Sequence, residues 1–453
     1  MSENVSNNTL HTGAMGKWTL LAMNVGNMIG AGVVTLVGQA MGMTGHSLWL
    51  AYTIALILGA IYNIPVLFVG STLRFDGGPY ALINTMLGKK FAGIYVVSFF
   101  MYLPSIALYA VGLGTYVKSI FPNIPIQVTA AVALTVFYCI NLFGANFLSR
   151  AQNFLVTFLL VGLATFAIMG MSKVDFTLLS PALNDNFMPN GFKGLFKGAF
   201  LLMFSTYGTY MVIFFSRHSK QPKKDVPFAI IWTIVAIFLF YIPVSIVASG
   251  VLPMSVVANQ PLTFVAREIL SKPVFIFFMI AAPFMALSST INSCMCAYTE
   301  PLYKATVDGW LPKKFGVTNK NGSPWMIITV VYLCSMIPLV LKWDINTIAN
   351  TLLLTDLLMG ILMMISFALI PKRYPNAWAN RECLKNVPNG VFYTAIILAS
   401  LVQIAIIINS IASIKLYIVI ATAVAFAIGI VHAIKKEKDG DIVVPSLEDE
   451  TKS

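Results

Sequence analysis

The chain of 453 residues is rich in apolar residues, at 58%, and poor in charged residues, at 10%, whereas soluble globular proteins carry roughly 25% charged residues. This excess of apolar surface cannot be buried in soluble cores, so the composition excludes a water-soluble enzyme and indicates an integral membrane protein in a lipid bilayer. The net charge of +12 is divided among short clusters between apolar runs, so it indicates membrane topology rather than a nucleic-acid partner.

Long windows without charged residues predict an all-α membrane protein with twelve transmembrane helices, because a helix needs about 20 apolar residues to cross a bilayer. Residues 18–73 contain two such helices, which we expect to separate near Thr44-Gly45-His46. The other windows are residues 91–117, 119–149, 151–172, 198–216, 226–266, 273–299, 321–341, 345–371, which Asp356 interrupts, 386–414 and 416–434.

Five basic clusters predict the orientation, because Lys and Arg are concentrated in cytoplasmic loops. We expect a multi-pass protein of the cell membrane with cytoplasmic tails at residues 1–16 and 435–453, since this orientation places every cluster inside. Residues 1–16 lack the apolar core of a signal peptide, so the first helix is expected to be retained. The clusters are Lys89-Lys90, Arg217 with Lys220, Lys223 and Lys224, Lys313-Lys314, Lys372-Arg373 and Lys435-Lys436.

The chain contains no nucleotide-binding loop, and its four histidines are scattered along the sequence. The five cysteines form no disulfide framework, and we interpret them as small apolar residues. We therefore expect no cofactor, no metal and no transport driven by ATP.

Two of the predicted helices contain glycine-bearing interruptions. The first helix includes Ile29-Gly30-Ala31-Gly32-Val33, and the sixth includes Phe204-Ser205-Thr206-Tyr207-Gly208. Unpaired backbone groups in a bilayer are tolerated only where they line a cavity or contact other protein. The interruptions are five helices apart, which is typical of inverted repeats around a central site.

This pair of interruptions predicts a site for an amino acid zwitterion. A half-helix that starts after Gly30 presents N–H groups, which suit a carboxylate, and a half-helix that ends before Gly208 presents carbonyl groups, which suit an ammonium. Charge-assisted hydrogen bonds of about 1.5–3 kcal/mol each would offset the desolvation of the zwitterion. The alternative is that Gly30 and Gly32 only allow close packing of helices.

Four motifs point to a known family. They are Ile29-Gly30-Ala31-Gly32-Val33; Arg74-Phe75-Asp76-Gly77-Gly78-Pro79-Tyr80; Lys220-Gln221-Pro222 with Val226-Pro227-Phe228-Ala229-Ile230; and Asp308-Gly309-Trp310-Leu311-Pro312. Together they resemble the motifs of the amino acid/polyamine/organocation permease superfamily, within it the L-amino acid transporter-like branch. The resemblance extends over roughly residues 15–435.

The resemblance implies two inverted five-helix repeats, as in leucine-transporter-type folds, at residues 17–172 and 192–371, followed by two additional helices at residues 386–434. It also implies that the unwound parts of helices 1 and 6 hold the substrate, with Phe204 near the gating aromatic position. Tyr241 is similar to a family position that touches the site, although it is equally well interpreted as a packing tyrosine.

Three departures from the family pattern affect the expected mechanism. Leu159 replaces a lysine that ties helices 1, 5 and 8 together in many relatives. Tyr210 occupies the position of a glutamate in cation-exchanging relatives, which favours substrates with neutral side chains, because a buried cation would lack a counter-charge. Glu300 stands where the family usually has an arginine, and Arg217 stands where the family usually has an acid. Because the two charges are reversed together, we expect Glu300 and Arg217 to pair across the inner vestibule. The alternative partner of Glu300 is Lys304, one helical turn away.

Three residues are candidates for coupling to an ion. Asp356 is an acidic residue deep within a predicted span, so it is a candidate proton carrier. The alternative is that its side chain only caps a helix at a kink. Ser288 and Ser289 offer hydroxyls where sodium-coupled relatives complete an oxygen cage, although they also suit close helix packing.

We therefore expect an amino acid permease that moves small neutral L-amino acids by alternating access, in exchange for another amino acid. A proton- or sodium-coupled symporter is the main alternative, and a non-transporting amino acid sensor or a channel is a more distant one. The sequence does not determine whether an accessory subunit is needed.

Overall fold

The computed structural model describes residues 13–206, 208–411, 414–439 and 442, and this part of the chain contains helices and no strand. The predicted all-α class is therefore confirmed. One isolated backbone bridge joins Met15 to Ser219.

The helices of the first half are α1 (Lys17–Met28), α2 (Ala31–Thr44), α3 (Leu48–Gly70), α4 (Pro79–Leu87), α5 (Lys89–Phe99), α6 (Ile106–Ile120), α7 (Ile126–Leu142) and α8 (Ala145–Met171), with short 3₁₀ turns η1 (Gly45–Ser47) and η2 (Leu103–Ser105). The second half contains α9 (Gly191–Met203), the 3₁₀ segment η3 (Gly208–His218), α10 (Pro222–Gly250), α11 (Met254–Val257), α12 (Thr263–Ile269), α13 (Lys272–Met279), the π-helical turn η4 (Ile280–Phe284), α14 (Met285–Val307), η5 (Lys313–Gly316), α15 (Trp325–Val340), α16 (Ile345–Arg373), α17 (Pro375–Ala379), α18 (Asn389–Ile411) and α19 (Leu416–Asp439).

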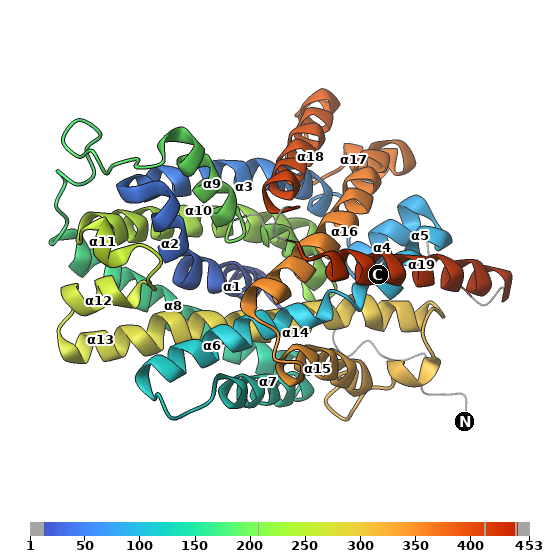
Figure 1. Cartoon of the computed structure of the whole chain (residues 1–453). Helices are drawn as coiled ribbons and strands as arrows, with labels where there is room; N and C mark the ends of the chain where they lie inside the picture. Colours follow the sequence, from blue (N-terminus) through green and yellow to red (C-terminus); the bar gives the residue numbers. More distant parts are fainter. Residues whose placement is uncertain (1–12, 207, 412–413, 440–441, 443–453) are drawn as a thin grey trace.

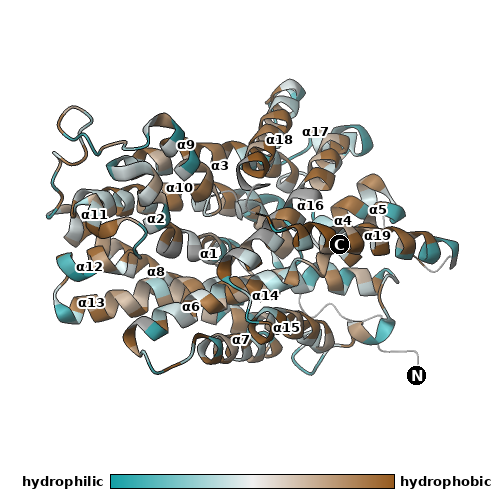
Figure 2. Ribbon diagram, in the orientation of Figure 1, coloured by the Kyte–Doolittle hydropathy of each residue, from teal (hydrophilic) through white to brown (hydrophobic). Residues whose placement is uncertain are grey.

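Nine helical segments in the described residues are long and apolar enough to cross a membrane, and α7 and α15 are shorter apolar helices. Most helices run side to side in Figure 1, with α11 and α12 at one end of the bundle and α17 at the other. Figure 2 shows hydrophobic residues along most of the helices and hydrophilic residues mainly in the loops and helix ends. Large apolar side chains remain exposed on outer helices, such as Ile168 on α8 and Val431 on α19. This arrangement is typical of helices that contact lipid.

Prolines explain further interruptions. The segment predicted over residues 91–117 is divided into α5 and α6, and Pro104 lies in the turn between them. The segment that contains α13 and α14 passes through η4, which includes Pro283. Proline lacks an N–H group and clashes with the preceding turn, so it commonly kinks or breaks a helix.

Several charge-free windows extend beyond the helices that they predict. The window over residues 226–266 becomes α10, which ends at Gly250, and the short helices α11 and α12. The window over residues 119–149 becomes the shorter α7, which starts after Pro125 and ends before Gly144, whose φ is +90°. The absence of charge does not identify turns, whereas proline and left-handed glycine do. The separation predicted near Thr44-Gly45-His46 is present as η1.

The centre of the bundle is formed by α1 and α14. Every residue of α14 from Ala286 to Thr306 is buried, and α1 packs against α8, α10 and α14. The interrupted first segment therefore lies in the protein interior rather than against lipid.

A buried guanidinium fixes the connection between α16 and α18. Arg381 donates hydrogen bonds to the carbonyl oxygens of Trp378, Leu384 and Val387 at 2.7–3.0 Å. Its guanidinium also lies over the rings of Trp378 and Phe68. Because Phe68 belongs to α3, this side chain joins the loop to the body of the protein.

We predict that Arg381→Gln destabilises the protein by about 2–4 kcal/mol, because each hydrogen bond from a charged group contributes about 1.5–3 kcal/mol and the loss is only partly compensated. Thermal unfolding of the purified protein in detergent measures the effect. Lys385→Gln, at an exposed position in the same loop, is the control and should leave the melting temperature unchanged. Equal melting temperatures for the two variants would show that Arg381 does not stabilise the loop.

Candidate functional site

The first predicted interruption separates α1 from α2. Helix α1 ends at Met28, Ile29 and Gly30 leave the helical conformation, and α2 starts at Ala31. Ile29 and Val33 are fully buried. The first N–H groups of α2 have no acceptor within their own helix, so they are available to a ligand or to neighbouring groups.

The second interruption separates α9 from η3. After Met203 the chain forms tight turns, in which Phe204, Ser205 and Thr206 each donate their N–H to the carbonyl three residues earlier. Segment η3 then starts at Gly208. Tyr207 lies outside the described residues. Both α-helices are thus interrupted where the glycines predict.

The fold brings the two interruptions into contact. A Cβ added at Gly32 would lie 2.0 Å from the Cβ of Ser205, and a Cβ added at Gly208 would lie 3.2 Å from Sδ of Met28. Glycine at position 32 is therefore required for this close approach. Phe204 is half-buried at the end of α9.

Tyr241 of α10 contacts the first interruption. Its hydroxyl donates a hydrogen bond to the carbonyl oxygen of Met28 at 3.2 Å, and its ring packs edge-on against Tyr52. The tyrosine holds the last turn of α1, so it lies beside the residues proposed to bind substrate.

Asn27 was not singled out from the sequence, yet it connects both interruptions with α14. Its side-chain amide contacts Sδ of Met211 on η3 at 2.7 Å, and its amide oxygen lies 3.0 Å from Sγ of Cys294. The available signal was a polar residue between Gly26 and Gly30 of an apolar span.

The hydroxyls of α14 meet α1 one residue later than expected. Ser289 and Thr290 both approach the carbonyl oxygen of Gly26, at 3.3 and 2.7 Å. Ser288 is also buried, but its hydroxyl has no hydrogen-bond partner among the described residues. The oxygen-rich contact between α1 and α14 therefore involves Ser289 and Thr290.

An amide side chain ties together the three helices that a lysine joins in relatives. Gln152 of α8 donates to the carbonyl oxygen of Ala22 on α1 at 3.3 Å and accepts from Asn292 of α14 at 2.8 Å. Leu159, where a lysine was expected from the family pattern, is fully buried. A neutral amide thus provides this connection in the present protein.

Arg217 and Glu300 lie close together, 3.9 Å apart, within a larger charged cluster. His218 is nearer to Glu300, at 2.8 Å, and Arg217 also lies 3.4 Å from Asp76. The cluster joins η3, α14 and the loop before α4 at the end of the bundle that we predict to face the cytoplasm. Residues 13–15 pair with the same end of η3, because Met15 donates its N–H to the carbonyl of His218.

Lys304, the alternative partner of Glu300, forms an ion pair with Asp308 at 3.6 Å. Tyr80 donates a hydrogen bond to the same carboxylate at 2.8 Å, which connects two of the sequence motifs. Burial raises the pKa of Asp308 above its usual value, and the nearby Lys304 partly opposes this shift.

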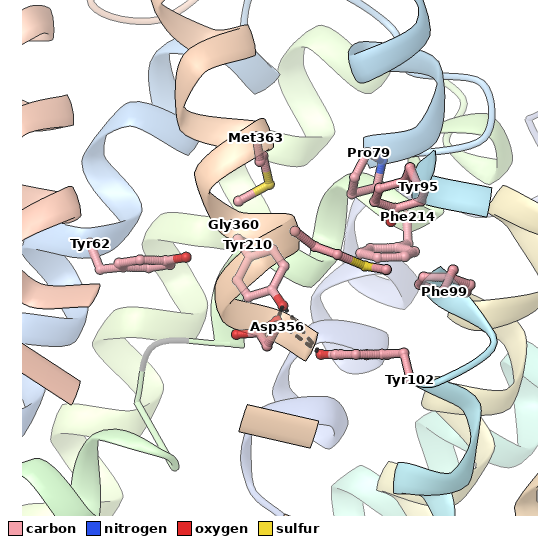
Figure 3. Close-up of a pocket in the computed structure, with 11 residues that line it drawn as sticks. Tyr62, Pro79, Tyr95, Phe99, Tyr102, Tyr210, Phe214, Asp356, Gly360 and Met363 are labelled. Atoms are coloured by element: carbon pink, nitrogen blue, oxygen red, sulfur yellow. Dashed lines mark hydrogen bonds between the residues drawn. The ribbon is translucent and has the colours of Figure 1, made fainter. Parts of the chain in front are cut away.

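Asp356 of α16 lies beside a small aromatic cavity (Figure 3). The hydroxyls of Tyr210 and Tyr102 donate to the same carboxylate oxygen, at 2.5 and 3.2 Å. The proton candidate from the sequence is therefore bonded to the segment that follows the second interruption. In the described part of the chain, no three potential ligands among His, Cys, Asp and Glu are placed to hold a metal ion.

Comparison with known proteins identifies the class. A family model described as amino acid permease matches residues 15–431, so the chain belongs to this family. Its members are membrane transporters rather than enzymes, and the chain is accordingly a multi-pass membrane protein.

Individual relatives are similar over much of the chain. An uncharacterized protein of Methanocaldococcus jannaschii is 28% identical over 66% of this chain and 69% of its own length. The branched-chain amino acid permease BcaP of Bacillus subtilis is 22% identical over 80% of this chain and 82% of its own. The histidine permease HisP of Lactococcus lactis is 30% identical over 47% of this chain and 48% of its own.

We predict that Glu300→Gln loosens the charged cluster, because removal of one partner from a buried ion pair commonly costs about 3–5 kcal/mol. Cys296, which is buried and lines a cavity with His218 and Glu300, should then react about 3–10-fold faster with a membrane-impermeant thiol reagent, a range equivalent to about 0.7–1.4 kcal/mol. Labelling rates in proteoliposomes measure this change, and Cys296→Ser identifies the reacting thiol.

The matched control is Lys90→Gln, which removes a solvent-exposed pair with Glu437. Exposed pairs contribute only about 0–1 kcal/mol, so the labelling rate should not change. An unchanged rate in Glu300→Gln would show that the pair does not restrict access from this side.

Proposed function

We propose that the protein is a secondary active transporter that moves neutral L-amino acids across the cell membrane by alternating access. The observation that supports this most strongly is the contact between two interrupted helices in the protein interior, at Gly32 and Ser205. The family match supports amino acids as the substrate class.

The interruptions supply complementary groups for a zwitterion. In the proposed site, N–H groups at residues 30–33 bind the carboxylate, and carbonyl groups at residues 204–208 bind the ammonium. Phe204 would shield the bound molecule, and Tyr241 would position the end of α1 through its hydrogen bond to Met28.

The architecture proposed for this mechanism has twelve membrane crossings. Residues 17–172 and 192–371 form two inverted five-helix repeats, and residues 386–434 form the additional pair. Tails at residues 1–16 and 435–453 lie in the cytoplasm. The distribution of basic clusters supports this orientation.

Neutral side chains are proposed because BcaP, a relative that covers most of the chain, is a branched-chain amino acid permease. Exchange for a second amino acid is the proposed transport mode. Sodium symport is a second candidate, because carbonyl and hydroxyl oxygens of Gly26, Ser289 and Thr290 gather between α1 and α14. Replacement of external sodium by choline would abolish uptake in that case and would leave exchange unaffected.

We expect the purified protein in proteoliposomes to take up a labelled neutral amino acid faster when unlabelled amino acid is preloaded. Gly32→Ala should reduce this counterflow more than about tenfold, because its Cβ would overlap Ser205 and overpacking costs about 1–3 kcal/mol. Gly16→Ala is the matched control on the same segment, since its Cβ would meet no atom within 4 Å.

Absence of preload-dependent uptake by the unaltered protein, for any of the common neutral amino acids, would contradict the proposed exchange. Normal counterflow in Gly32→Ala would contradict the proposed site.

A further inference from the structure

We propose that the first turns of α1 and α10 together bind the headgroup of an anionic phospholipid from the cytoplasmic leaflet of the membrane. This headgroup site consists of Lys17 and Trp18 on α1 and of Lys224, Phe228 and Trp232 on α10. Its side chains lie on the outer surface of the bundle, away from the buried interruptions. The assignment to the cytoplasmic leaflet rests on the proposed orientation, whereas the site itself does not.

Aromatic rings position the ammonium group of Lys17 at this surface. Its Nζ lies 5.1 Å from the centre of the Phe228 ring and 5.7 Å from that of Trp18. The two rings meet edge-on with their centres 5.2 Å apart, so they join α1 to α10. A cation within about 6 Å of an aromatic face is attracted to the ring and keeps its charge. The exposed ammonium of Lys17 is therefore held between the two helices, where an anion can reach it.

The face of α10 adds a second lysine. Lys224, Phe228 and Trp232 follow one another at intervals of four residues, so they share one face of the helix. The rings of Phe228 and Trp232 have their centres 6.1 Å apart. Lys224 is exposed and lies one helical turn before the ring that Lys17 covers. Two positive charges are thus presented beside a row of aromatic side chains.

The positive charge of this surface is not neutralised by a neighbouring acid. Three lysines occur within residues 220–224, and Asp225, which follows them, is buried. The carboxylate of Asp225 accepts hydrogen bonds from the hydroxyl of Ser219 and the N–H of Gln221, at 2.7 and 3.1 Å. Neither Lys17 nor any of the three lysines forms an ion pair with another described residue. An anionic ligand complements this surplus of positive charge.

Two exposed tryptophans favour a lipid as the source of that anion. The exposed fraction is 65% for Trp18 and 49% for Trp232. Tryptophan is enriched where the bilayer meets water, because its ring is apolar and its N–H donates a hydrogen bond. Trp232 lies about 12 Å along α10 from Lys224, so the row extends from the charged end of the helix into its apolar part.

The surface therefore matches both parts of a phospholipid. The lysines suit the phosphate, and the rings suit the glycerol and the first methylene groups of the acyl chains. Basic pockets between helices at the cytoplasmic side of a membrane are suited to anionic headgroups. A soluble phosphate would use the lysines but would leave the tryptophans without a ligand.

The test measures lipid binding to the full-length protein in detergent, where neither orientation nor transport affects the result. Phosphatidylglycerol and phosphatidylcholine with identical acyl chains are titrated separately, and the bound lipid is counted by native mass spectrometry. We expect phosphatidylglycerol to bind about 5–30-fold more tightly. This preference is equivalent to about 1–2 kcal/mol, because each lysine near a headgroup contributes about 1 kcal/mol.

Lys17→Gln combined with Lys224→Gln should abolish the preference for phosphatidylglycerol. Lys224→Gln alone leaves the ring contacts of Lys17 in place and should lower the preference about 2–5-fold. This single variant decides the question if the double variant fails to fold. The matched control is Lys313→Gln combined with Lys314→Gln, which removes two exposed lysines elsewhere on the side predicted to be cytoplasmic. It should retain the full preference.

Four results would overturn the proposal. Equal binding of the two lipids by the unaltered protein would exclude the site, and an unchanged preference in Lys224→Gln would show that its lysine does not contact the headgroup. An equal loss in the control variant would indicate a general effect of charge. Displacement of phosphatidylglycerol by equimolar glycerol phosphate would assign the site to soluble phosphates. Each of these results leaves the proposed transport function intact, because counterflow tests that function separately.

Discussion

The structure depends on the requirement that backbone polar groups within a membrane find partners. Most of the chain meets this requirement with continuous helices, but the α-helical pattern is interrupted at residues 29–30 and 204–206. Both interruptions lie inside the bundle, where protein surrounds them and lipid does not. Interrupted helices are tolerated at this position because protein surrounds them.

The elements around the interruptions hold them at a short distance. Gly32 allows α2 to approach Ser205, and the hydroxyls of Tyr241 and Thr290 bind carbonyl oxygens of Met28 and Gly26. These contacts come from α10 and α14, which are distant in sequence from α1. Segment η3 is bonded to other elements through His218, which pairs with Glu300, and through Tyr210, which donates to Asp356.

Glycine positions and charge patterns predicted the features that depend on local chemistry. Gly30 and Gly208 predicted the interruptions, Gly45 predicted the turn between the first two long segments, and opposite charges predicted the approach of Arg217 to Glu300. Features that depend on packing between distant helices could not be predicted. His218 as the nearer partner of Glu300 is one example.

Tyr210 and Gln152 show why contacts between distant helices could not be predicted from the sequence. In the sequence, Tyr210 is noticeable only because it stands where cation-exchanging relatives have a glutamate. Its partner Asp356 is 146 residues away. Gln152 replaces the connection of a missing lysine by bonding to α1 and α14, although the family pattern places that lysine seven residues further on, at Leu159. The partner of a polar side chain is determined by the helix against which it packs, and periodicity within one helix does not identify that neighbour.

The central claim is that both poles of an amino acid bind to the two interruptions. The most direct measurement is competition for binding of labelled leucine to the purified protein by leucine, by the corresponding amine without a carboxylate, and by the corresponding acid without an amino group. We expect each analogue to bind about 5–150-fold more weakly than leucine, because loss of one charge-assisted contact leaves buried backbone groups unpaired and costs about 1–3 kcal/mol. Competition by either analogue at leucine-like concentrations would contradict recognition at both poles.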